Sequence, residues 1–176
     1  MKENYLIVVD MQNDFIDGDL GSGQAREALG KAVALAEDFE GKLIFTRDTH
    51  FEDYLETSEG KNLPVVHCIK DTPGWEISKP LDEIRLKRSS LVYEKYTFGS
   101  RKLAEDMLSL YEAGKVGEIH LCGVCTDICV VSNALLIKAA IPEAPIFVHR
   151  DCCAGVTPEK HDAALEVMAS CQIAVV

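Results

Sequence analysis

Apolar and polar positions divide the chain into short β-type runs and longer stretches with helical spacing. The first run, residues 5–9, is continuously apolar, which is typical of a strand buried in a parallel sheet. Further strands are predicted over residues 42–46, 90–94, 117–122, 145–149 and 172–176. Helical spacing predicts helices over residues 24–39, from Ser100 through Tyr111, over 128–140 and from Thr157 onward, with a short helix or turn over 80–88.

Alternating strands and helices predict one fold class. The pattern favours a three-layer α/β/α architecture with a central, mainly parallel sheet of about six strands. A chain of 176 residues suits a single domain, here residues 1–176. Two stretches without a period, residues 11–23 and 51–76, are predicted loops, and a loop as long as the second is usually functional.

The composition narrows the class of partner. A net charge of −11 argues against binding to nucleic acid or to an anionic membrane surface. No apolar run approaches the roughly 20 residues of a membrane span, and no basic segment precedes an apolar one at the N-terminus. Seven cysteines, an odd number, make a disulfide framework unlikely to be the basis of the fold. We therefore expect a cytoplasmic protein with reduced thiols that acts on a small molecule.

Reactive side chains follow four of the predicted strands. Asp10, the pair Asp48 and His50, Lys95 and Cys129 all lie just past strand ends, which share one edge of a parallel sheet. If Thr126 or Asp127 caps the following helix, Cys129 lies in its first turn, where free N–H groups and the helix dipole stabilise a thiolate. Cys129 is therefore the candidate nucleophile.

The motifs around these residues resemble those of a known family. Residues 10–15 read DMQNDF and resemble the opening motif of the isochorismatase-like cysteine hydrolases. Residues 123–130, GVCTDICV, are similar to the nucleophile turn of that family, and residues 93–96, YEKY, to its lysine motif. Residues 151–155, DCCAG, match as well, so the resemblance extends over essentially the whole chain.

The resemblance implies a cysteine-dependent amidase. It makes Asp10, Lys95 and Cys129 the catalytic triad, in which the thiol attacks an amide carbonyl and Asp10 transfers protons. Lys95 would orient Asp10 and favour its charged form. The backbone N–H groups of Cys125 and Cys129 would stabilise the oxyanion. The resemblance further implies a cis peptide bond between Val124 and Cys125.

A metal site is implied by the nicotinamidase branch of this family. Asp48, His50 and His67 look like its metal-binding signature, and three N/O ligands suit Zn²⁺ or Fe²⁺, with Mn²⁺ as a further option. Relatives often have a fourth ligand in this loop; Glu59 is the first candidate here and Glu56 the second. From the residues alone, a hydrogen-bonded pair of Asp48 and His50 that stabilises a loop would be favoured; the family pattern favours the metal site.

The expected reaction is hydrolysis of nicotinamide to nicotinic acid and ammonia, in NAD salvage. Phe15, Val124 and Trp75 are the candidates for contact with the substrate, and the aromatic rings of Phe15 and Trp75 could pack on its flat ring. Trp75 follows His67 in this chain, whereas the corresponding tryptophan of nicotinamidases precedes the histidine. Relatives are often dimers or larger, so a homo-oligomer is expected.

Other readings of the same residues remain open. A metal-independent relative would hydrolyse a carbamoyl or ureido group or a small aliphatic amide. Cys122 and Cys125 form a C-x-x-C pair, which in a cytosolic α/β protein can be a redox site, although Cys122 is predicted to lie within a strand. The remaining alternatives are a structural zinc held by Cys122, Cys125, Cys152 and Cys153, and a non-enzymatic binding module with an unreactive Cys129.

Overall fold

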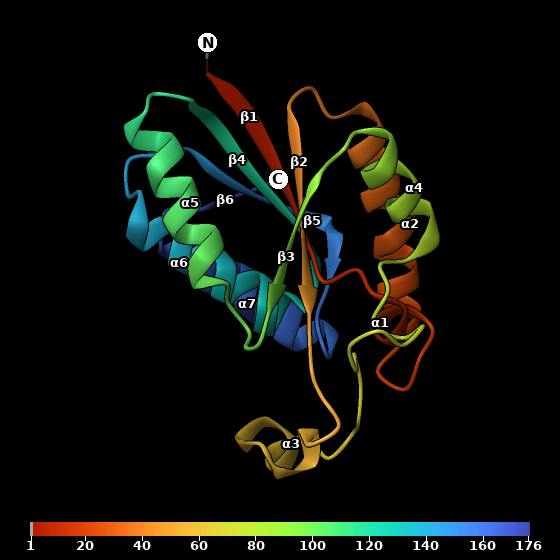
Figure 1. Ribbon diagram of the computed structural model, residues 1–176. Helices are drawn as coiled ribbons and strands as arrows, with labels where there is room; N and C mark the ends of the chain where they lie inside the picture. The colour runs from red at the N-terminus through yellow and green to blue at the C-terminus, as the bar shows by residue number, and fades with distance from the viewer. Residues whose placement is uncertain (1) are drawn as a thin grey trace.

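A single six-stranded parallel sheet forms the centre of the protein. The computed structural model describes residues 2–176, and its strands lie in the order β3-β2-β1-β4-β5-β6 (Figure 1). Every strand pair is parallel. The strands are β1 (Glu3–Val9), β2 (Lys42–Asp48), β3 (Leu91–Lys95), β4 (Val116–Val124), β5 (Ile146–Ala154) and β6 (Ala174–Val175). The predicted fold class is confirmed.

Helices cover both faces of this sheet. In Figure 1, α2 and α4 lie on one side and α5, α6 and α7 on the other, which makes the three layers. Their bounds are α2 (Gly23–Asp38), α4 (Lys79–Lys87), α5 (Arg101–Glu112), α6 (Val131–Ala140) and α7 (Pro158–Ser170). Ser100 and Thr157 cap α5 and α7 through their side chains. Among residues 2–176, no helix has both the length and the apolar character needed to cross a bilayer.

The sheet explains the apolar runs of the sequence. Residues 6–9 of β1 have no exposed surface, because β1 lies between β2 and β4 and both of its faces pack against helices. The chain order reverses at β1, since β2 and β3 continue on one side and β4, β5 and β6 on the other. A ligand crevice at the carboxyl ends of strands is expected at such a point.

The structure differs most from the predicted elements in three segments. Residues 11–23 contain a short helix, α1 (Asn13–Ile16), and residues 51–76 contain η1 (Tyr54–Glu56) and α3 (Ser58–Asn62). Strand β5 continues past residue 149 to Ala154, because Arg150 and Asp151 keep extended backbone although they are polar. In Figure 1, α3 extends beyond the strand ends, below the rest of the molecule.

Candidate active site

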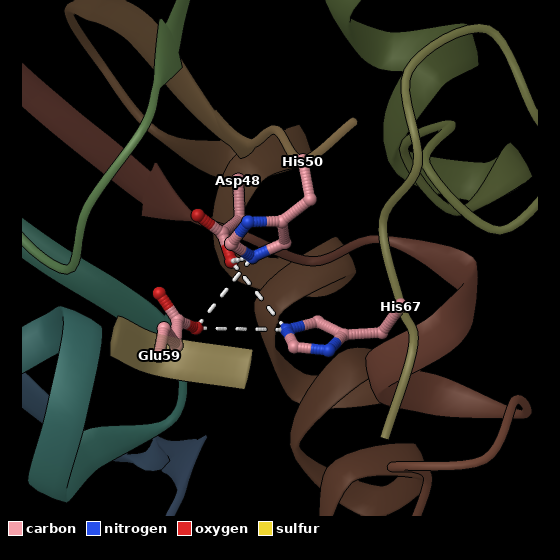
Figure 2. Close-up of side chains that lie close together, drawn as sticks. All are labelled: Asp48, His50, Glu59 and His67. Carbon is pink, nitrogen blue, oxygen red and sulfur yellow. Dashed lines mark hydrogen bonds and ion pairs between the residues drawn. The ribbon is translucent and has the colours of Figure 1, made fainter. Parts of the chain in front are cut away.

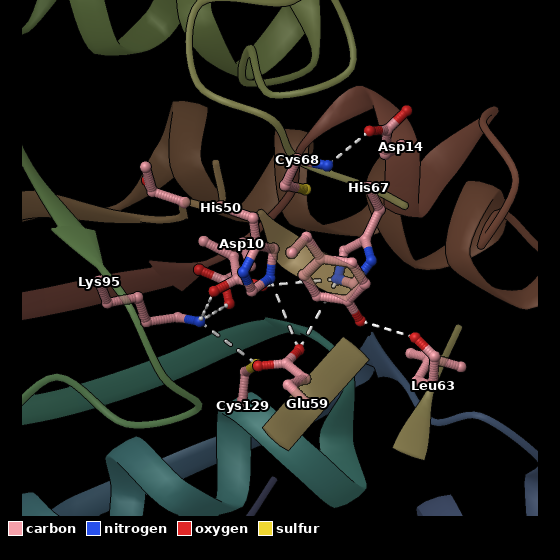
Figure 3. A network of polar contacts seen from close by, with 12 residues as sticks. Asp10, Asp14, His50, Glu59, Leu63, His67, Cys68, Lys95 and Cys129 are labelled. Carbon is pink, nitrogen blue, oxygen red and sulfur yellow. Dashed lines mark hydrogen bonds and ion pairs between the residues drawn. The ribbon is translucent and has the colours of Figure 1, made fainter. Parts of the chain in front are cut away.

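Lys95 is the centre of a buried polar cluster at the carboxyl ends of the strands. Its Nζ atom lies 2.6 Å from Asp10 Oδ2 and 3.4 Å from Cys129 Sγ, as Figure 3 shows. Asp10 follows β1, Lys95 ends β3, and Cys129 follows β4, so the topology brings together residues up to 119 positions apart. All three side chains are buried. The structure thus assembles the predicted triad, although the roles of its members stay predictions.

Asp10 is held by a residue that sequence reasoning missed. The backbone at Asp10 has a left-handed φ of 48°. The Thr46 hydroxyl donates to Asp10 Oδ1 at 2.6 Å and accepts from the Asp10 N–H at 3.2 Å. The other carboxylate oxygen, Oδ2, has no hydrogen-bond donor among the described residues beyond its ion pair with Lys95. That oxygen is therefore the one able to accept a proton.

Burial changes the protonation chemistry of the cluster. Burial raises the pKa of Cys129 well above its ordinary value; Lys95 opposes this shift, and Asp10 and Asp48 add to it. Burial also raises the pKa of Asp10, more than the Lys95 charge lowers it. Desolvation therefore opposes the dipole-stabilised thiolate that the sequence led us to expect, and that thiolate stays a prediction. A neutral thiol lies beside a carboxyl group with a raised affinity for a proton.

The turn that carries Cys129 is a π-helical turn, η2 (Thr126–Val130), and neither predicted cap exists. The Thr126 hydroxyl hydrogen-bonds instead to Nδ1 of His161 at 2.8 Å, and Asp127 accepts from the Val156 N–H at 2.9 Å. The turn is thereby tied to the start of α7. The predicted cis peptide bond between Val124 and Cys125 is present.

Gly123 allows this turn to approach β1. Its φ is 127°, and a Cβ atom there would lie 2.0 Å from the carbonyl oxygen of Val9. Only glycine therefore fits at the end of β4 without a shift of the backbone.

Four side chains converge beside the triad in a second cluster (Figure 2). They are Asp48, His50, Glu59 and His67, and one ligand atom from each lies within 4.8 Å of all the others. His50 Nε2 is 3.0 Å from Asp48 Oδ2 and 3.5 Å from Glu59 Oε1. The first candidate for the fourth position, Glu59, belongs to the cluster, whereas Glu56 is exposed and lies outside it.

The donor set of this cluster fits a divalent metal ion. A zinc ion bound at about 2.1 Å separates its ligand atoms by roughly 3.0–3.5 Å, and His67 Nε2 is 3.8 Å from Asp48 Oδ2 and 3.9 Å from Glu59 Oε1. Burial opposes ionisation of Asp48, but the hydrogen bond to His50, the nearby His67 ring and the Lys95 charge hold its pKa well below the usual range. Two imidazoles and two carboxylates suit zinc, iron or manganese.

The outer contacts of the ligands are also in place. Lys95 Nζ donates to Asp48 Oδ1 at 3.0 Å, so Oδ2 is left to face the histidines. Nδ1 of His67 lies 2.7 Å from the Val65 carbonyl oxygen, which orients the ring with Nε2 inward. Tyr54, which sequence reasoning missed, is fully buried and packs edge-on against the rings of His50 and His67, with centroids 4.6 and 5.1 Å away.

One cavity of about 940 Å³ joins the two clusters. Cys129, the four cluster residues, and the predicted contacts Phe15 and Val124 all line it. Trp75 does not, which corrects the expectation that it meets a substrate. Its indole N–H donates to Thr49 Oγ1 at 2.9 Å, and the Arg47 guanidinium lies 3.4 Å from the ring centroid, so Trp75 is a packing residue behind the strand ends.

The thiol alternatives gain no support from the geometry. All seven cysteines are free. Cys122 is fully buried within β4, and burial raises its pKa well above the ordinary value, opposite to the shift that activates a redox cysteine. Within residues 2–176, the group that could hold a metal is the Asp48 cluster, and no comparable group forms from the cysteines proposed for a structural zinc.

Comparison with known proteins supports the same assignment as the motifs. Residues 4–176 match the profile of the family described as the Isochorismatase domain. The chain belongs to the isochorismatase family. The predicted family is therefore confirmed, and the six-stranded sheet described above is this family's scaffold in the present chain.

Solved structures of similar proteins cover nearly the whole length of this isochorismatase-family chain. A nicotinamidase/pyrazinamidase from Bacillus subtilis is 29% identical with a TM-score of 0.79, and the match covers 100% of both chains. A pyrazinamidase from Pyrococcus horikoshii in complex with zinc is 26% identical, with a TM-score of 0.78 and 99% and 98% coverage. An N-carbamoylsarcosine amidase from Thermoplasma acidophilum is 26% identical, with a TM-score of 0.75 and 99% and 95% coverage.

Proposed function

We propose that this isochorismatase-family protein hydrolyses nicotinamide to nicotinic acid and ammonia, through an acyl-enzyme on Cys129, and that the reaction serves NAD salvage. The observation that carries the proposal is the contact of Lys95 with Asp10, Cys129 and Asp48, which joins the triad to the four-residue cluster. Cys129 and the four cluster residues line one cavity. The similarity to a nicotinamidase/pyrazinamidase over the full chain supports the choice of substrate.

Formation of the acyl-enzyme begins with a neutral thiol. As Cys129 Sγ bonds to the carboxamide carbon, its proton moves to Asp10, whose raised pKa suits it to accept one. The carbonyl oxygen becomes an oxyanion, for which the backbone N–H groups of Cys125 and Cys129 are the proposed donors. The C–N bond then breaks, Asp10 returns the proton to nitrogen, and ammonia leaves.

Hydrolysis of the thioester uses the same groups in reverse. A water molecule attacks the acyl carbon while Asp10 takes its proton. The C–S bond breaks, nicotinic acid is released, and the proton returns to Cys129 Sγ. Lys95 keeps its charge throughout, because Asp10, Cys129 and Asp48 outweigh the effect of burial and raise its pKa well above the ordinary value. Its role is to hold Asp10 and to balance charge near Sγ.

The substrate ring would be oriented by the four-residue cluster beside the triad. Asp48, His50, Glu59 and His67 would hold a zinc, iron or manganese ion. Such an ion, or water on it, supplies a Lewis-acid contact for the pyridine nitrogen. Phe15 lines the cavity with its ring centroid 5.4 Å from that of His67, so it offers an apolar face next to the ligands on which an aromatic substrate can pack.

A substrate panel tests the proposal. Ammonia release is measured from nicotinamide, an N-carbamoyl amino acid and a short aliphatic amide, with metal content determined on the same preparation. We expect nicotinamide to be preferred, about one bound metal per chain, and loss of activity after chelation that returns with added metal. Activity on the carbamoyl substrate alone, unaffected by a chelator, would overturn the assignment in favour of a metal-independent amidase. The cytoplasmic location and the homo-oligomer stay predictions.

A further inference from the structure

The loop between β1 and α2 contacts the metal-ligand segments through side chains that the reaction does not use. Gln12 and Asp14 belong to the opening motif of the chain, yet neither lines the cavity. Gln12 has no exposed surface, and Asp14 is half-buried. Both direct their polar atoms at backbone groups next to the candidate metal ligands.

The Gln12 amide fixes the backbone of the ligand Asp48. Its Nε2 donates to the carbonyl oxygens of Asp48 and Trp75, each at 2.8 Å, and its Oε1 accepts from the Asp48 N–H at 2.7 Å. Both amide hydrogens and the oxygen are therefore used. Asp48 pairs with Lys95 of β3, but the pairing of β2 with β1 ends at Phe45, so the Gln12 amide supplies the backbone partner on the β1 side.

The Asp14 carboxylate fixes the peptide that follows the ligand His67. Asp14 Oδ2 accepts from the Cys68 N–H at 2.7 Å, and the Cys68 carbonyl accepts from the His50 N–H at 2.9 Å. Figure 3 shows the contact between Asp14 and Cys68 beside His67. Cys68 has a left-handed φ of 48°, a conformation that a cysteine adopts only where its surroundings hold it.

The fit around Asp14 leaves it little freedom. A Cβ atom on Gly74 would lie 2.2 Å from Asp14 Oδ1, and the Asp14 N–H donates to the Gly74 carbonyl at 3.0 Å. The carboxylate is thus enclosed by the segment that returns from the ligand loop. Its position, and with it that of Cys68, is set by packing as well as by hydrogen bonds.

We propose that Gln12 and Asp14 are positioning residues for the metal site: they preset the backbone at Asp48 and at His67–Cys68 so that the ligands converge before an ion binds. The inference rests on the metal site of the proposed function. Residues that orient ligands typically contribute about 10- to 100-fold to metal affinity. Without them, the ion itself would have to order the loop, and its apparent affinity would fall.

The experiment compares metal affinity among matched variants of the full chain. Apo-protein is titrated with Zn²⁺ in competition with a chelating dye, and with Co²⁺ while the visible absorption of the bound ion is recorded. Gln12→Glu places an oxygen against two carbonyls, and Asp14→Ala removes the acceptor for Cys68. Asp14→Asn keeps an acceptor oxygen. Asn13→Ala is the control, because it removes a bond of the same loop to the Pro73 carbonyl, away from the ligands.

We expect about 10- to 100-fold weaker zinc binding and an altered Co²⁺ spectrum for Gln12→Glu and Asp14→Ala, with Asp14→Asn and Asn13→Ala close to wild type. The melting temperature of each apo-protein shows whether it is folded. If Gln12→Glu does not fold, Asp14→Ala carries the test. Equal affinities in all folded variants would overturn the positioning role alone. Absence of metal binding by the wild type would overturn the metal site as well, whereas metal binding without nicotinamide hydrolysis would overturn only the proposed function.

Discussion

Replacement of Lys95 by methionine removes the cation that two buried carboxylates share. Lys95 Nζ is 2.6 Å from Asp10 and 3.0 Å from Asp48, and its side chain is 1% exposed. At an effective dielectric constant of about 20, the two attractions are about 6.4 and about 5.5 kcal/mol, which the cost of burying the ammonium group largely offsets. Loss of one partner from a buried ion pair costs about 3–5 kcal/mol, because the other partner stays buried. We expect that loss in the free energy of unfolding.

The same substitution should add a pH dependence. Burial already raises the pKa of Asp10, and Lys95 is a cause that lowers it, so the variant raises it further. A group with a raised pKa in the folded state stabilises the fold at low pH, and the contribution is lost as pH rises through the folded pKa. The deficit of Lys95→Met relative to wild type should therefore be larger at pH 8 than at pH 5.5.

The assay is urea unfolding of metal-free protein, followed through the fluorescence of Trp75, the single tryptophan. The double variant Asp10→Asn/Lys95→Met is the matched control. It removes one of the two buried carboxylates left without a cation and should recover part of the lost free energy of unfolding. A deficit below about 1 kcal/mol at both pH values, or one that shrinks as pH rises, would refute the description of Lys95 as the shared buried cation.

Two further predictions concern residues outside the triad. Trp75→Phe should reduce the free energy of unfolding by about 1 kcal/mol, through loss of the hydrogen bond to Thr49, and change kcat/KM for nicotinamide by less than about threefold; a much higher KM would return Trp75 to the substrate site. His149 Nε2 lies 2.9 Å from His120 Nδ1, and burial together with His120 lowers the pKa of His149. The unfolded chain therefore binds more protons than the folded protein in mild acid, and the free energy of unfolding falls as pH drops below about 6.5. His149→Gln should flatten this fall by up to about 1.4 kcal/mol per pH unit, measured by urea unfolding between pH 7.5 and 5.5; an unchanged slope would contradict it.

The fold was readable from the sequence because a parallel sheet buries its strands on both faces. That requirement left an unbroken apolar run in β1 and compact β-type runs in the others, so the strands were predicted even where their ends were not. The far end of β5 was missed because the polar residues Arg150 and Asp151 interrupt the apolar run, at an irregularity after which pairing with β4 resumes at Cys153 and Ala154.

The candidate site was predicted as far as residues act through their own chemistry. Thiols, carboxylates and imidazoles at strand ends could be identified from the sequence, and the family motifs assigned them to one site. Thr46 had one usable signal, a polar residue closing an apolar run, and Gln12 had only its place in the opening motif, whereas Tyr54 had none. They act on backbone atoms or on neighbouring rings, and such partners leave no period in the sequence. Trp75 was misjudged because its ring packs on Arg47, a contact that spacing does not reveal.

The central claim is that Cys129 is the nucleophile of a nicotinamide-hydrolysing enzyme. The most direct test is ammonia release from nicotinamide by the wild type and by Cys129→Ala, each shown to be folded and to bind the same amount of metal. We expect turnover by the wild type and a loss of at least about 1,000-fold in the variant, because without the thiol no acyl-enzyme forms. Ammonia release by Cys129→Ala at a rate near that of the wild type would contradict the account.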